Sequence, residues 1–100
     1  MQLISNETLQ AIERELGLDL LDEGQRSIMM TDIISLISSR AGLRIIKEFD
    51  AQTTEEFNRI PDDQPEEMEK FILDRNPRAQ EIFEDEAGKV KREILGAKLA

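Results

Sequence analysis

The side chains that could do chemistry in this chain are carboxylates and hydroxyls, because it contains no histidine and no cysteine. Without histidine, the chain lacks the commonest general base and the commonest metal ligand at neutral pH. Without cysteine, it can form no disulfide and no reactive thiolate. Catalysis would therefore have to come from paired acids or from a serine activated by a lysine.

Two pairs of acids have a spacing that acid–base catalysis could use, Glu13 with Asp19 and Glu81 with Asp85. A general acid needs a carboxyl whose pKa is raised by burial, and acids on polar helical faces are normally solvated. Glu81 and Asp85 are like charges one helical turn apart, and nothing indicates burial of either pair. We therefore interpret both pairs as surface charges.

Several serines lie in and around the most aliphatic part of the chain. They are Ser27, Ser35, Ser38 and Ser39. A serine nucleophile needs a base beside it, and only Lys47 or Lys70 could take that role here. The spacing does not establish such a pair. We therefore predict that the protein is not an enzyme and has no catalytic residue, no cofactor and no small-molecule substrate.

An acidic cluster between positions 62 and 69 offers oxygen ligands of the kind that divalent cations prefer. Its members are Asp62, Asp63, Glu66, Glu67 and Glu69. The cluster lacks the D-x-D-x-D-G loop with a closing glutamate, and Pro61 and Pro65 limit how the chain can wrap an ion. We therefore expect a solvated loop and helix start, and no metal site.

The net charge of −9, from 22 acids and 13 bases, restricts the class of partner. A surface of this sign repels nucleic acid and anionic membranes and favours basic partners. A short basic stripe near the C-terminus matches the negative end of a helix dipole better than it matches an RNA site. It consists of Lys89, Lys91, Arg92 and Lys98. We expect the partner to be another protein or a second copy of this chain, with no nucleic acid and no membrane.

The opening residues MQLISNETLQ show no basic segment followed by an apolar run, so they do not resemble a secretory signal. The most apolar stretch, residues 28–37, is interrupted by Thr31, Asp32 and Ser35 and is too short to span a bilayer. The expected location is the cytoplasm.

Helical periodicity predicts an all-α fold, a compact bundle of four to five helices around a long central helix. The chain is expected to form one domain over residues 1–100, with frayed ends at about 1–4 and 96–100. The central helix covers residues 22–49, begins at the cap Asp22, and contains Gly42, which can kink or split it. Its apolar side chains form a broad arc that several neighbours must cover. They are Met29, Met30, Ile33, Ile34, Leu36, Ile37, Ala41, Leu43 and Ile45.

Shorter helices are expected around this one, at about residues 6–16, 54–59, 65–76 and 77–95. Gly17 is expected to end the first in a left-handed conformation, Thr53 to cap the second and Pro65 to open the third. Asn76 and Pro77 are expected to begin the last.

Bulky apolar residues outside the central helix are expected in the core. Three leucines in the short connection after the first helix should plug one end of the bundle, since a surface loop rarely carries so many. They are Leu18, Leu20 and Leu21. The four phenylalanines should fill the aliphatic core.

The order of these features resembles a family of small all-helical bacterial domains of uncharacterised function. The resemblance runs over about residues 5–95, through ELGLDLL, LRIIKEF, TTEEFNRI and PEEMEKFILDRNPRAQEIFEDEAGKVKREIL. Its most specific parts are Leu16-Gly17-Leu18 and Asn76-Pro77. It implies the order of helices and brings no active site with it.

The central helix is the favoured site for a partner. Four small residues recur along it at i, i+4, i+7 and i+11: Thr31, Ser35, Ser38 and Gly42. They would let a second helix approach closely or would simply face solvent. The candidate partner-binding residues are these four and their apolar neighbours Met29, Leu36 and Leu43. The leading hypothesis is a non-enzymatic protein–protein interaction module, which requires an apolar patch to remain exposed. The alternative is an acidic mimic or inhibitor that binds a basic surface of another protein.

Overall fold

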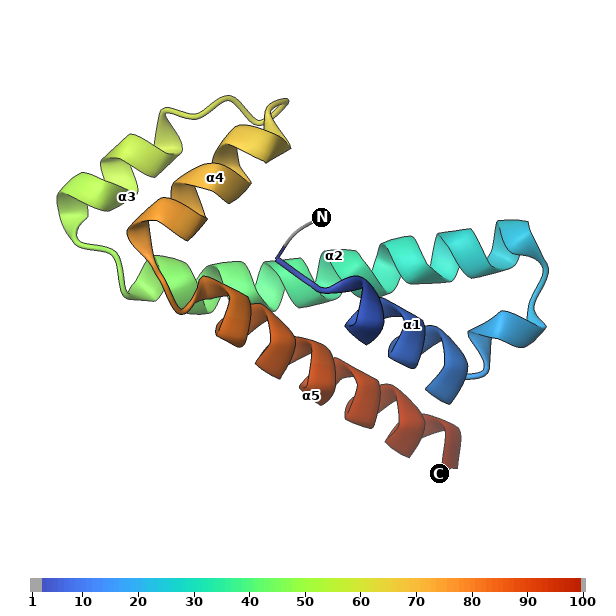
Figure 1. Cartoon of the computed structure of the whole chain (residues 1–100). Coiled ribbons are helices and arrows are strands. Elements are labelled where there is room, and N and C mark those ends of the chain that lie inside the picture. The colour runs from blue at the N-terminus through green and yellow to red at the C-terminus, as the bar shows by residue number, and fades with distance from the viewer. Residues whose placement is uncertain (1–2, 100) are drawn as a thin grey trace.

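The computed structural model describes residues 3–99, and the side chains of residues 3–97. Over this range the chain is helical with no strand (Figure 1), so the predicted all-α class is confirmed. The elements are α1 (Asn6–Glu15), the short 3₁₀-helix η1 (Leu18–Leu20), α2 (Glu23–Lys47), α3 (Ala51–Asn58), α4 (Pro65–Arg75) and α5 (Ala79–Leu99).

The bundle is elongated, with principal extents of 45 × 25 × 20 Å and a radius of gyration of 14.9 Å. A compact domain of this length has a radius of gyration of about 13 Å. The extra length comes from α2, which runs along the molecule, and from α3 and α4, which form a hairpin at one end (Figure 1).

The long central helix is continuous. Its cap is Asp22, whose carboxylate accepts the N–H of Gln25 at 2.8 Å, as predicted. Gly42 does not interrupt it, and a Cβ at this position would meet no atom within 4 Å. The residues on either side of the glycine in the core, Ala41 and Ile45, are fully buried, and this packing holds the helix straight through its least favourable residue.

The core lies mainly between α2 and α5, which run side by side (Figure 1). Each helix contributes one apolar stripe at helical spacing. The buried residues of α2 are Met30, Ile33, Ile37, Ala41 and Ile45, and those of α5 are Ala79, Ile82, Phe83, Ala87 and Val90. Ion pairs flank this seam, with Arg40 on Glu93 and Arg44 on Asp85 and Glu86.

The N-terminal segment completes the core. Leu3 and Ile4 are 2% and 0% exposed, so these residues are packed rather than frayed. The backbone N–H of Ser5 donates to Glu84 of α5 at 3.0 Å, which fixes the entry to α1. The chain also remains helical to Leu99, beyond the predicted start of fraying at position 96.

The turn after α1 follows the prediction at one leucine and departs from it at another. Gly17 has φ 73°, the left-handed conformation expected of a helix terminator. Leu18 is buried, and Leu21 is half-buried against the core. Leu20, however, is 88% exposed, so its predicted place in the plug is wrong. The tight 3₁₀ turn after Gly17 directs Leu18 inward and Leu20 outward.

The α3–α4 hairpin has its own small cluster of aromatic rings. Phe49 lies 6.1 Å from both Phe57 and Phe71, centroid to centroid, and Arg75 stacks over Phe71 at 5.1 Å. These three rings are half-buried, and only Phe83 of the four phenylalanines lies in the main core. The hairpin is therefore a satellite of the α2–α5 body, joined to it through the end of α2.

Two predicted helix starts are wrong by a few residues. The cap of α3 is Asp50, whose carboxylate accepts the N–H of Thr53 at 2.7 Å, so Thr53 lies inside the helix. The last helix begins at Ala79 because Asn76 and Pro77 form a turn instead. In that turn the Asn76 side chain accepts the N–H of Arg78 and donates to Glu48 at the end of α2.

Candidate interaction surface

One of the two predicted pairs of acids, Glu81 with Asp85, is engaged in surface ion pairs. Asp85 accepts a hydrogen bond from Arg44, and Lys89 lies 3.2 Å away. The hydrogen bonds from Arg44 and Lys89 hold the pKa of Asp85 below its ordinary value, whereas a general acid needs the opposite shift. Glu81 pairs with Arg78. In the other predicted pair, Asp19 is exposed and Glu13 is half-buried.

The serines of α2 carry no activated hydroxyl. Ser35 and Ser39 are exposed to solvent, whereas the Ser38 hydroxyl oxygen is buried and has no hydrogen-bond partner in the described part of the chain. A nucleophile needs a base within hydrogen-bonding distance. Ser38 is therefore a small residue packed at the margin of the core.

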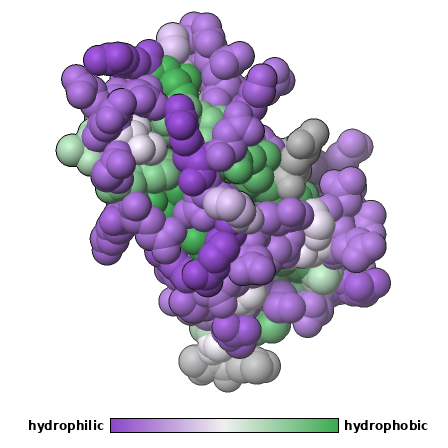
Figure 2. All heavy atoms as spheres, turned by 60° about the vertical axis from the view of Figure 1, so that its left-hand side comes forward, coloured by the Kyte–Doolittle hydropathy of each residue, from purple (hydrophilic) through white to green (hydrophobic). Residues whose placement is uncertain are grey.

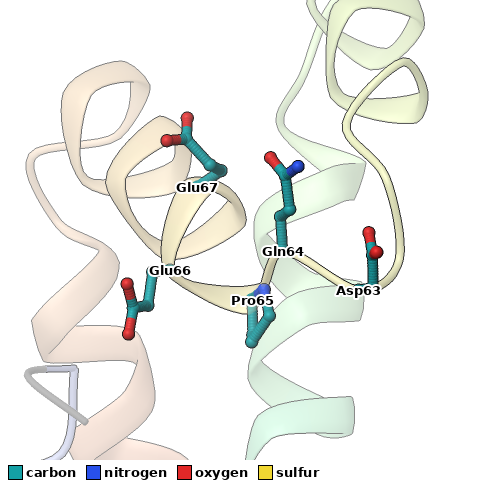
Figure 3. A pocket seen from close by; sticks show the side chains of 5 residues that line it. All are labelled: Asp63, Gln64, Pro65, Glu66 and Glu67. Carbon is teal, nitrogen blue, oxygen red and sulfur yellow. The ribbon is translucent and has the colours of Figure 1, made fainter.

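The acidic loop before α4 forms a shallow pocket whose carboxylates do not converge (Figure 3). Glu66 and Glu67 point away from each other, and Asp63 lies on the far side of Pro65 from both. A cation site needs several oxygens directed at one point. Among the described residues, no group of three or more acids has an arrangement that could hold a metal ion.

The feature with the clearest physical meaning is the side of α2 that faces away from α5. We call this the outer face, and define it as the exposed residues of α2 between positions 28 and 43. They are Ile28, Met29, Thr31, Asp32, Ser35, Leu36, Ser39 and Leu43. Among the described side chains, four of the five exposed large hydrophobic ones lie on it, Leu20 being the fifth. The outer face is therefore apolar and small, with Asp32 as its single ionisable group.

Three of the predicted partner-binding residues form a regular row on the outer face. Met29, Leu36 and Leu43 are 40%, 42% and 62% exposed, and they recur every seven residues. Seven residues are close to two turns of an α-helix, so the three side chains lie nearly in line along α2. This is the spacing at which one helix packs along another.

The predicted small residues lie beside this row and partly outside it. Thr31 and Ser35 are exposed, while Ser38 and Gly42 are half-buried at the margin. The hydroxyl of Thr31 bonds to the carbonyl of Ser27 within the helix at 2.8 Å, so it is not directed at a partner. The structure thus brings the apolar row together with Ser35 and Gly42, and sets Ser38 toward the core.

Three members of the outer face are not among the residues predicted from the sequence: Ile28, Asp32 and Ser39. The apolar one, Ile28, is 65% exposed. Its position one residue before Met29, in the first turns of a helix whose core stripe begins at Met30, is the signal that could have identified it.

The charges of the protein are not evenly distributed. Helix α2 has more bases than acids: Arg26, Arg40, Arg44 and Lys47 against Glu23 and Asp32. Residues 50–75, which form the α3–α4 hairpin, contain nine acids and three bases. Figure 2 shows the side of the molecule toward the hairpin end, where hydrophilic side chains predominate and hydrophobic ones reach the surface in separate areas. The acidity therefore resides largely away from the outer face.

None of the helices in residues 3–99 is long and apolar enough to cross a membrane. Comparison of the chain with protein families, with curated proteins and with solved structures found no match.

Proposed function

We propose that the protein is a non-enzymatic interaction module that binds another protein through the outer face of α2. The observation that carries this proposal is the row of Met29, Leu36 and Leu43, exposed on a helix whose opposite side is fully packed. Exposed apolar side chains gathered on one surface are typical of interaction sites, whereas scattered ones are not.

The best-fitting ligand is an amphipathic helix. A straight apolar row with seven-residue spacing presents side chains that a second helix can interdigitate with. Ser35 and Ser39 lie between the larger residues and leave room for the partner's side chains. Asp32 provides the one place on this face where a partner's basic residue would be favoured.

The test compares three baits for capture of partners from lysate of the native host: the wild type, Leu36→Asp and the control Leu20→Asp. Both leucines are exposed, so neither substitution should unfold the protein, but only Leu36 lies on the outer face. We expect the wild type and the control to capture the same proteins and Leu36→Asp to lose them. Calorimetry with the purified partner should then show at least about tenfold weaker binding for Leu36→Asp. Equal binding by all three baits would contradict the proposal.

A second function is favoured by the acidity of the α3–α4 hairpin. Nine acids against three bases on one projecting element could engage a basic surface, as an acidic mimic or inhibitor does. Such binding weakens steeply with salt. Titration of a polylysine peptide at low and high salt tests it: salt-independent binding, or binding that is unchanged when Glu66 and Glu67 are replaced by Gln, excludes this function.

A further inference from the structure

We infer that the occupant of the outer face is a second copy of this chain, bound with the two α2 helices antiparallel and the two-fold axis near Leu36. This inference rests on the proposed function and names the partner for the same surface. It follows from the area of the chain, the spacing of the outer face and the distribution of charge.

The accessible surface is larger than a monomer of this mass should have. The chain exposes 6845 Å² at a mass of 11.5 kDa. A compact monomer of that mass exposes roughly 5,800 Å². The excess is about 1,000 Å², which is close to the roughly 800 Å² that each partner contributes to a standard interface. The elongated shape and the α3–α4 hairpin account for part of this excess, and the outer face contributes to it through four exposed large hydrophobic side chains.

The spacing of the outer face is self-complementary. An axis at Leu36 places Leu36 against its own copy, and it places Met29 against Leu43 of the second copy. The Leu36 pair lies on the axis and occurs once, and the Met29–Leu43 pair occurs twice, as an isologous interface requires. Seven-residue recurrence keeps the row aligned along a gently supercoiled pair of helices. Gly42 has open space where a Cβ would lie, so the backbones can approach closely at this margin.

Charge selects the antiparallel arrangement. It places the acidic start of α2, at Glu23, near the basic end of the second copy's α2, at Lys47. It also opposes the two helix dipoles. The acidic hairpins then lie at opposite ends of the pair, with the two Lys47 residues about 33 Å apart along the helix axis and well beyond the Debye length. A parallel pair would place the two hairpins side by side.

The first experiment is light scattering on the full chain at high micromolar concentration. We expect twice the 11.5 kDa chain mass for the wild type and for Leu20→Asp. Leu36→Asp should be a monomer with an unchanged helical circular dichroism spectrum, since self-association should weaken by about 100-fold or more when a charge replaces a central apolar contact. A monomeric wild type overturns the inference. So does a Leu36→Asp variant that remains dimeric.

The second experiment tests the register of the two α2 helices by disulfide cross-linking. Because the chain contains no cysteine, only the introduced thiols can react. Leu36→Cys chains should form a disulfide-linked dimer under mild oxidation. Met29→Cys chains should link rapidly when mixed with Leu43→Cys chains and only at the background rate alone, with Leu20→Cys as the background. Rapid linking of Met29→Cys with itself would overturn the antiparallel arrangement.

These results distinguish failure of the dimer from failure of the proposed interaction face. A monomeric wild type whose Leu36-dependent capture of another protein persists rejects the second copy and supports the interaction face. A dimer that forms regardless of Leu36, together with capture that ignores Leu36, rejects both.

Discussion

Leu36 and Ile37 are neighbours in the chain and belong to different surfaces of α2: Leu36 is 42% exposed, and Ile37 is fully buried against α5. The boundary between the packed core and the outer face therefore passes between two adjacent aliphatic residues. Ile37 stabilises the fold, and we propose that its neighbour Leu36, also aliphatic, binds a partner.

This boundary predicts opposite outcomes for two similar substitutions. Ile37→Ala should lower the free energy of unfolding by about 2–5 kcal/mol, because it opens a cavity in the α2–α5 seam. Leu36→Ala should cost less, about 1 kcal/mol or less in the monomer, because Leu36 is 42% exposed and its removal opens no enclosed cavity. Urea denaturation at a concentration where the chain is monomeric measures both. Equal losses would show that Leu36 is part of the core.

Gly42, inside α2, and Gly17, in the left-handed turn after α1, should respond oppositely to replacement by alanine. Gly42→Ala should raise the free energy of unfolding by about 1 kcal/mol, since the new Cβ meets no atom and glycine is a poor helix residue. Gly17→Ala should lower it by about 1 kcal/mol or more, because φ 73° is strained for alanine. Thermal and urea denaturation provide the comparison, and stabilisation by Gly17→Ala would contradict the terminator role.

The aromatic cluster should control the hairpin locally. Phe71→Ala should cost about 3 kcal/mol, the lower end of the range for phenylalanine because the ring is half-exposed. It removes the ring contacts to Phe49 and Phe57 and the stacking of Arg75. Amide hydrogen exchange should accelerate in α3 while the α2–α5 seam remains protected. Phe71→Leu, which keeps most of the volume, is the control and should give a smaller effect.

Acidification should weaken the protein through two carboxylates. Hydrogen bonds from the Thr53 side chain and backbone lower the pKa of Asp50, and those from Arg44 and Lys89 lower the pKa of Asp85. A carboxyl with a lowered folded-state pKa binds its proton more readily when unfolded. Its stabilisation is thus complete above the unfolded pKa of about 4 and disappears as the pH falls through the folded value.

Asp85→Asn should therefore show a shallower loss of stability below about pH 4 than the wild type. Denaturant titrations across the acid range measure this slope. Asp50→Asn is a useful comparison, because asparagine still caps α3 but does not titrate. Slopes identical to that of the wild type in both variants would contradict the assigned causes.

The helices themselves were largely predictable, because local signals specify them. Asp22, Gly17 and Pro65 act as the sequence indicated. The start of α3 was predicted with less precision, since Asp50 and Thr53 both offer a capping oxygen and the helix uses the earlier one, Asp50. Local signals identify a helix more reliably than they identify its first residue.

The outer face was predictable in part for the same reason. A broad apolar arc on the central helix follows from residue spacing alone. The covered portion depends on where α1, η1 and α5 lie, which spacing does not determine. Leu20 shows the limit clearly: its apolar character indicated burial, and the short turn after Gly17 directs it to solvent.

The most direct test of the outer face is one capture experiment with three baits, the wild type, Leu36→Asp and Leu20→Asp, scored for bound host proteins and for a differently tagged second copy of the chain. The interaction face predicts that the wild type and Leu20→Asp capture at least one of the two kinds of partner and that Leu36→Asp captures neither. Retention of the same proteins and the same amount of second copy by Leu36→Asp would contradict it.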